Sequence, residues 1–168
     1  MPGSFLDSNI VLYLASEDLL KADRAQELVA EGGTISVQVL NEIANISRRK
    51  MGLSWAETRN FLLMIRGLLK VEPITIEIHD VGISLAERYQ LSVYDSMIVS
   101  AALSAECDTL LSEDLQDGLL INGRLRVLNP FLGVTGRPIP QSQNYLPISW
   151  SLARHEDGRC FGGGRRSP

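Results

Sequence analysis

The stretch Ser4-Phe5-Leu6-Asp7-Ser8-Asn9 places an apolar run before an acid, and a segment of helical character follows it. We expect a first strand over Ser4–Asp7 and a helix over Ser8–Ala15. Short apolar runs and amphipathic stretches go on alternating along most of the chain, which predicts an α/β domain with a mainly parallel sheet. Right-handed crossovers between parallel strands would place helices on both faces of that sheet.

Working outward from this stretch, apolar periodicity, capping residues and turn residues predict the other elements. Further helices are expected over residues 21–31, 37–50, 54–69, 77–89 and 94–106, and further strands over 34–36, 71–75 and 108–112. Pro73 predicts that its strand lies at an edge, because proline donates no hydrogen bond to a neighbouring strand. Asn122–Gly123, between two apolar runs, predicts a hairpin within Leu119–Leu128.

The composition indicates an ordinary globular protein. The chain has 168 residues, of which 45% are hydrophobic and 21% charged. Its longest apolar run, Ile10–Ala15, is far shorter than the roughly 20 residues of a membrane helix. We find no secretory signal, and Cys107 and Cys160 are expected to be unpaired thiols. These features predict a cytoplasmic protein without a membrane partner.

Charge and turn residues divide the chain near residue 134. Residues 135–168 hold five arginines, two acids and a Gly162–Gly164 run, and we expect a folded domain over 1–134 followed by a poorly ordered tail. A docking arm for a partner is the alternative for this tail. Because the whole chain has a net charge of −4 and the tail is basic, the domain itself is strongly acidic. A nucleic-acid substrate would need a local device that overcomes the repulsion of this acidic domain.

Acidic side chains are expected to converge at one edge of the predicted sheet. Asp7 and the pair Glu113–Asp114 each follow a strand, and ligand sites in α/β sheets lie beyond the carboxyl ends of the strands. Asp95 falls in the first turn of a helix and should point toward the same edge. Glu42 borders the apolar face of its own helix.

Each of these acids also has an ordinary structural explanation. Asp7 and Asp114 suit helix or turn caps, Asp95 forms a capping pattern with Ser92, and Glu42 suits a solvated helix face. Convergence would change this, because two carboxylates about 4 Å apart repel by roughly 4 kcal/mol at an effective dielectric near 20. A divalent cation with oxygen ligands is the expected neutraliser.

Several short motifs in this order resemble the PIN-domain family, and within it the VapC-type toxins. The resemblance covers about Phe5 to Leu132. Its motifs are Phe5-Leu6-Asp7-Ser8-Asn9, Asn41-Glu42-Ile43, Tyr94-Asp95-Ser96, Leu111-Ser112-Glu113-Asp114-Leu115 and Leu125-Arg126-Val127-Leu128-Asn129-Pro130-Phe131.

The resemblance implies a three-layer α/β/α domain and a metal-dependent endoribonuclease of a toxin–antitoxin pair. Asp7, Glu42, Asp95 and Asp114 would then be the catalytic, metal-binding quartet, with Mg²⁺ as the cofactor and Mn²⁺ as a substitute. Ser112 and Asn9 match positions that support such a site. Glu113 stays outside the quartet, and Asp117 is interpreted as a turn residue.

Partners are expected from the same resemblance. It implies an RNA substrate, a cognate VapB-like antitoxin that blocks the acidic groove, and a homodimer. Arg48 and Arg49 are candidate RNA contacts, although they also suit charge compensation at a helix end. An apolar face around Trp55, Phe61, Leu62, Met64 and Ile65 suits either the core or the dimer seam.

Two other functions stay open at this point. One is an aspartyl-phosphate phosphohydrolase with Asp7 as the nucleophile, although Asn9 stands where such enzymes usually carry a second aspartate. The other is a non-catalytic PIN-like binding module. Failure to trap a covalent phosphoryl-aspartate would dispose of the first alternative. Metal-supported RNA cleavage separates the second from the nuclease.

Overall fold

A computed structural model describes residues 3–133, and the expected tail over 135–168 lies outside the described residues. The described elements follow one another as β1 (Ser4–Leu6), α1 (Ser8–Leu12), the 3₁₀ turn η1 (Tyr13–Ala15), α2 (Leu19–Ala30), β2 (Thr34–Ser36), α3 (Val37–Arg49), α4 (Trp55–Leu68), β3 (Lys70–Glu72), α5 (Ile76–Tyr89), α6 (Val93–Ser104), β4 (Thr109–Leu111), β5 (Leu120–Ile121) and β6 (Leu125–Leu128).

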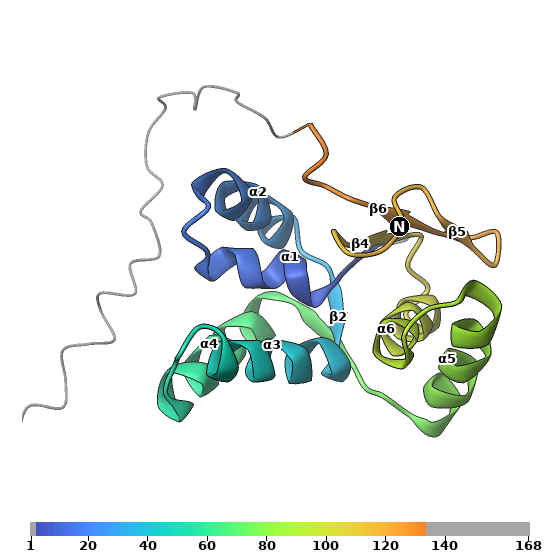
Figure 1. Ribbon diagram of the computed structural model, residues 1–168, viewed down its shortest axis with the longest axis horizontal. Coiled ribbons are helices and arrows are strands. Elements are labelled where there is room, and N and C mark those ends of the chain that lie inside the picture. The colour runs from blue at the N-terminus through green and yellow to red at the C-terminus, as the bar shows by residue number, and fades with distance from the viewer. Residues whose placement is uncertain (1–2, 134–168) are drawn as a thin grey trace, which may run out of the picture. The chain divides into compact units, whose positions relative to one another are not determined.

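The six strands form one sheet in the order β3-β2-β1-β4-β6-β5. Every neighbouring pair is parallel except β5 and β6, which form the antiparallel hairpin expected around Asn122–Gly123. The chain steps outward from β1 to β3 and then crosses back to β4. Right-handed crossovers therefore put α1–α4 on one face and α5–α6 on the other, as Figure 1 shows. The predicted three-layer α/β/α fold is confirmed.

Local sequence signals explain most element boundaries. Ser54 and Glu57 form the expected capping box of α4, and Ser36 caps α3 through a hydrogen bond from the Val39 amide. The edge position of β3 is confirmed, but Pro73 directly follows this strand instead of interrupting it. A proline cannot extend the ladder, so the strand ends before it.

The core lies between the sheet and its two helical layers. Phe5, Ile35, Leu110 and Val127 on four neighbouring strands are fully buried. Helix α6 is buried over most of its length, and the hydroxyl of its Ser100 donates a 2.7 Å hydrogen bond to the Ile78 carbonyl of α5. The α5–α6 layer is thus held together by packing and by a buried polar contact between its two helices.

Two expectations concern the chain's environment. Among residues 3–133 no helix combines the length and the apolar character that a membrane span requires. Cys107 is a free, buried thiol, as expected, and Cys160 lies outside the described residues.

Candidate active site

Asp7 is the most buried acid of the predicted quartet. It follows β1 directly, its side chain is nearly inaccessible, and its Oδ1 accepts a 2.6 Å hydrogen bond from the Ser8 amide. Asp7 therefore caps α1, and its ordinary structural explanation holds. The cap is not the only contact of this carboxylate, because the side chains of Ser8, Asn9 and Ser112 also lie within hydrogen-bond distance of it.

Glu42 reaches the same place from α3. The Ser8 hydroxyl donates to Glu42 Oε2 at 2.7 Å and lies 3.4 Å from Asp7 Oδ1, so one hydroxyl lies between the two carboxylates. On the other side, Gln38 Nε2 donates to Glu42 Oε1 at 3.0 Å. Both carboxylate oxygens of the half-buried Glu42 thus accept hydrogen bonds, one of them from the hydroxyl that also approaches Asp7.

Asn9 joins Asp7 to Asp114. Its amide nitrogen donates to Asp7 Oδ2 at 3.2 Å and to Asp114 Oδ2 at 3.0 Å. Its amide oxygen accepts from the Glu113 backbone at 3.3 Å. The predicted supporting residue thus connects the end of β1 with the loop after β4, and it brings together two acids that are far apart in the sequence.

Ser112 makes the second connection between these segments. Its hydroxyl donates to Asp7 Oδ2 at 2.7 Å and accepts the amide hydrogens of Asp114 and Leu115 at 3.3 and 3.2 Å. Ser112, rather than Asp114, therefore caps the turn that follows β4. Asp117, expected to be a turn residue, accepts from the Asn129 amide at 2.8 Å.

Asp95 approaches the cluster from the first turn of α6. Its Oδ2 accepts from the Ser92 hydroxyl at 2.7 Å, and its amide donates to the same hydroxyl at 3.1 Å, so the predicted capping pattern is present. No hydrogen bond among the described residues links Asp95 to the rest of the quartet. Its negative charge nevertheless acts on Asp7.

The electrostatics of Asp7 reflect this arrangement. The pKa of the Asp7 carboxyl is raised from its ordinary 3.8 to about 6, mainly by burial and to a smaller extent by the charges of Glu42 and Asp95. Hydrogen bonds from Ser112 and Ser8 act in the opposite direction but do not offset burial. The site thus favours a proton, or another positive charge, close to Asp7.

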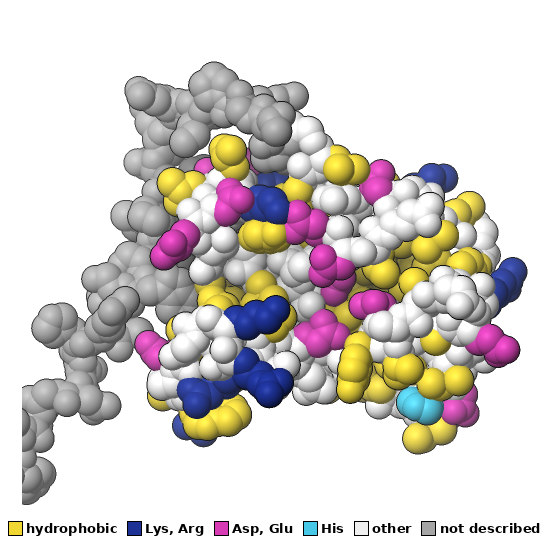
Figure 2. All heavy atoms as spheres, in the orientation of Figure 1, with side chains coloured by type: hydrophobic (Ala, Val, Ile, Leu, Met, Phe, Trp, Pro, Cys, Tyr) yellow, Lys and Arg dark blue, Asp and Glu magenta, His cyan; other side chains and the backbone are white. Residues whose placement is uncertain are grey.

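The donor atoms of the quartet are of the kind that a hard divalent cation prefers. Its members present only carboxylate oxygens, Asp114 is exposed, and Glu42 and Asp95 are half-buried. Within residues 3–133, however, no three Asp, Glu, His or Cys side chains stand close enough together to hold a metal ion. Figure 2 shows acidic side chains gathered where α1, α3 and α6 meet. A cation would have to draw these carboxylates inward.

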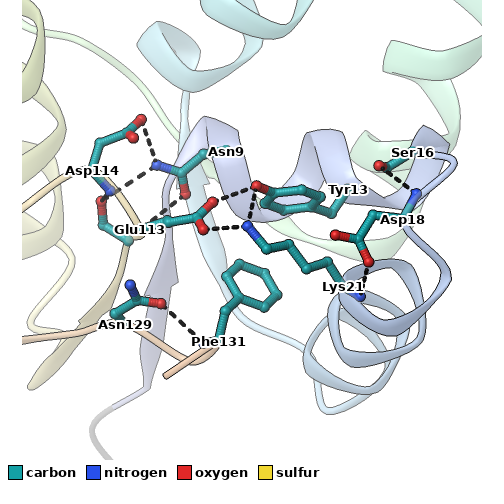
Figure 3. A network of polar contacts seen from close by, with 10 residues as sticks. Asn9, Tyr13, Ser16, Asp18, Lys21, Glu113, Asp114, Asn129 and Phe131 are labelled. Atoms are coloured by element: carbon teal, nitrogen blue, oxygen red, sulfur yellow. Dashed lines mark hydrogen bonds and ion pairs between the residues drawn. The ribbon is translucent and has the colours of Figure 1, made fainter. Parts of the chain in front are cut away.

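A polar cluster beside the quartet was missed by the sequence analysis. Glu113 accepts hydrogen bonds from the Tyr13 hydroxyl and the Lys21 ammonium, and Lys21 also donates to the Tyr13 hydroxyl at 2.8 Å. Phe131 packs edge-on against Tyr13, with ring centroids 4.8 Å apart. Figure 3 shows these side chains meeting beside Asn9 and Asp114.

This cluster fixes the loop that carries Asp114. Burial opposes ionisation of Glu113, yet the hydrogen bonds from Lys21 and Tyr13 hold the pKa of this carboxyl below its usual value. The hydrogen bond to Glu113 in turn raises the pKa of the Lys21 ammonium. The sequence gives little sign of this cluster. Tyr13 and Lys21 have the character of ordinary helix residues, and they meet only in the folded chain.

Of the two candidate RNA contacts, Arg48 has an evident structural role. Its guanidinium lies 4.7 Å from the centre of the Trp55 ring and donates to the Leu53 carbonyl. Arg49, the last residue of α3, is exposed. The apolar face expected on α4 is divided, since Phe61 and Ile65 are buried core residues whereas Trp55 is 62% exposed.

Comparison with known proteins places this chain in a family. The family model described as the PIN domain matches residues 4–116. A search among curated proteins found no match.

Solved structures share the fold. A toxin–antitoxin complex from Klebsiella pneumoniae has 18% identity and a TM-score of 0.58, over 76% of this chain and 97% of that one. VapC20 of Mycobacterium tuberculosis, described as a sarcin-ricin loop cleaving toxin, has 17% identity and a TM-score of 0.56, over 66% and 91%. VapBC2 of Rickettsia felis, bound to a DNA fragment from its promoter, has 20% identity and a TM-score of 0.56, over 74% and 96%. At these identities the likeness concerns the fold.

Proposed function

The chain belongs to the PIN domain family, and on that premise we propose that it is a metal-dependent endoribonuclease, the toxin of a VapBC-type toxin–antitoxin pair. The observation that carries the proposal is the buried Asp7 carboxylate, whose pKa is raised by burial and by the charges of Glu42 and Asp95. Buried acids without a basic partner are costly to the fold, and they cluster at functional sites. An RNA-cleaving neighbour of the same fold supports this choice of reaction.

Asp7, Glu42, Asp95 and Asp114 would hold Mg²⁺, or Mn²⁺ in its place. The bound cation would supply Lewis-acid charge for water activation and for the leaving oxygen of the scissile phosphodiester. Asp7 would release its proton as the cation binds, because the two positive charges compete for one carboxylate. Asn9 Nδ2 and the Ser112 hydroxyl would keep the Asp7 and Asp114 oxygens turned toward the shared space.

The acidic site also defines the expected partners. A phosphate-bearing RNA strand would be repelled by four carboxylates unless a cation lay among them, so RNA binding at this edge would depend on the metal. We propose a VapB-like antitoxin as the inhibitor of the site, a homodimer as the assembly and the cytoplasm as the location. The toxin–antitoxin complexes among the structures of this fold support the antitoxin.

A non-catalytic PIN-like binding module is the second candidate. One observation favours it, namely that within the described residues no three acids converge tightly enough for a metal site. The two candidates differ in a direct test. The nuclease should cleave RNA in Mg²⁺ or Mn²⁺, and both excess EDTA and Asp95→Asn should abolish the cleavage. Metal-dependent cleavage that Asp95→Asn leaves intact would contradict the assigned site, and absence of cleavage would favour the binding module.

A further inference from the structure

The junction of α3 and α4 carries an exposed aromatic ring among arginines. Trp55 opens α4 with 62% of its surface exposed. Arg48, Arg49 and Arg59 are its basic neighbours in sequence on the two helices. We call Arg48, Arg49, Trp55 and Arg59 the Arg–Trp patch. Figure 2 shows basic side chains over α3 and α4 on the same face as the acidic cluster.

The Trp55 ring is held from one side. The Arg48 guanidinium lies 4.7 Å from the ring centre and is anchored to the Leu53 carbonyl of the α3–α4 loop. A cation stacked on an aromatic ring limits the movement of the ring. Because the ring is already ordered, it loses little conformational entropy when a third group binds to it. Trp55 as a whole residue is 62% exposed, so a ligand can reach it.

One arginine of the patch lies on the same side of α3 as the proposed active site. Arg49 follows Glu42 by seven residues on α3, so the two side chains share one side of the helix and are separated by about 10 Å along its axis. On α4, Arg59 follows Trp55 by four residues and lies on the same helix face. Arg49 is thus the member of the patch that lies on the Glu42 side of α3, about 10 Å along the helix from the proposed active site.

We propose that the Arg–Trp patch binds a single-stranded segment of the RNA substrate next to the scissile phosphate. A base stacks on Trp55, and Arg49 and Arg59 contact backbone phosphates. Aromatic rings beside arginines bind single strands without regard to sequence, because every base has a π-face. The patch also supplies the local positive charge that an acidic domain needs to bind a polyanion. This inference rests on the proposed ribonuclease function.

A second copy of the chain fits this surface poorly. In a twofold dimer the same patch would face itself, so the arginines of one copy would lie against those of the other. Like charges in contact oppose association. A phosphate backbone has the opposite charge, which is why RNA is the favoured occupant.

The test uses Trp55 as its own reporter. The chain has two tryptophans, and replacing Trp150, outside the described residues, by Phe leaves Trp55 as the single fluorophore. In this background Asp95→Asn prevents cleavage, and the full-length protein is titrated with single-stranded RNA of about 10 nucleotides. An abasic strand of equal length is the matched ligand, since it keeps the phosphates but cannot stack. We expect Trp55 fluorescence to be quenched by RNA and much less by the abasic strand.

Variants test the same contact through affinity. Trp55→Leu should weaken RNA binding roughly five- to hundredfold, as expected for the loss of one stacked base. Arg49→Ala should reduce the salt dependence of binding by about one phosphate contact. Ile76→Ala, which truncates a 73% exposed side chain on α5, is the control and should change neither. Circular dichroism of each variant confirms its fold.

Several results would overturn the proposal. Equal quenching by both strands would exclude stacking. Quenching by polyglutamate but not by RNA would assign the patch to an acidic protein, and quenching that rises with protein concentration alone would assign it to a second copy. Cleavage assays in the parent sequence separate the two claims. If RNA is cleaved but Trp55→Leu leaves KM unchanged, the patch fails and the nuclease stands. If Trp55 is quenched without any metal-dependent cleavage, the nuclease fails.

Discussion

The Ser112 hydroxyl donates a 2.7 Å hydrogen bond to Asp7 Oδ2, although the two residues lie 105 positions apart in the sequence. The parallel pairing of β1 with β4 creates this contact, because it brings the carboxyl ends of both strands to one edge. The same hydroxyl accepts the amide hydrogen of Asp114. One small side chain therefore sets the separation of two proposed metal ligands.

Ser112→Ala should destabilise the protein and impair its site. The substitution removes a donor to a buried carboxylate, which typically costs about 1–3 kcal/mol. Ser112→Thr keeps the hydroxyl and is the matched control. Urea unfolding near neutral pH measures the free energy. Equal stability of Ser112→Ala and the parent protein would show that the hydroxyl contributes nothing to Asp7.

Asp7→Asn should stabilise the metal-free protein at neutral pH. The folded state raises the pKa of Asp7 to about 6, so it binds more protons than the unfolded state between pH 3.8 and about 6. The parent protein should lose about 3 kcal/mol of stability as the pH rises through this window. Asp7→Asn lacks this titration, so its advantage should grow from about pH 4 to pH 7. Urea unfolding in EDTA at both pH values measures it, and an advantage independent of pH would contradict the raised pKa.

Lys21→Met should weaken cation binding with only a small loss of stability. The substitution removes one hydrogen-bond donor to Glu113. Because Glu113 precedes Asp114 in the loop that Asn9 contacts, the proposed ligand Asp114 should become less well positioned. Lys21 and Glu113 are both about a quarter exposed, which limits the stability effect to about 1 kcal/mol. Isothermal titration with Mn²⁺ measures the affinity. Lys70→Met, which breaks the ion pair between the exposed Lys70 and Glu72, is the control and should leave the affinity unchanged.

Mn²⁺ should stabilise the parent protein against heat. A ligand that binds only the folded state at a hundred times its dissociation constant adds about 2.7 kcal/mol. Differential scanning calorimetry should show a rise in Tm that is absent in Asp7→Asn and Asp95→Asn. A rise that survives both substitutions would place the cation elsewhere.

The fold was predictable because its signals are local. Ser54 with Glu57 marked the start of α4, Asn122–Gly123 marked the hairpin, and Pro73 marked an edge strand. The start of α2 was placed two residues late, at Lys21 instead of Leu19, because the Asp18 cap was overlooked. The alternation of strands and helices along the chain then predicted a sheet covered by helices on both faces.

The candidate site was predictable only in part. Acids at strand ends and a capping pattern pointed to Asp7, Asp95 and Asp114, but no local pattern showed that Tyr13 and Lys21 would meet Glu113. Those contacts depend on how α1 and α2 pack beside the loop after β4. Whether the four carboxylates share a cation depends on small side-chain movements, which capping motifs do not specify.

The most direct test is anomalous diffraction from crystals of the full chain grown or soaked with Mn²⁺. We predict a Mn²⁺ peak bound by Asp7 and by at least two of Glu42, Asp95 and Asp114, and loss of that peak in Asp7→Asn crystals. A Mn²⁺ peak held by other residues, or density showing these carboxylates apart in saturating Mn²⁺, would contradict the shared cation on which the account depends.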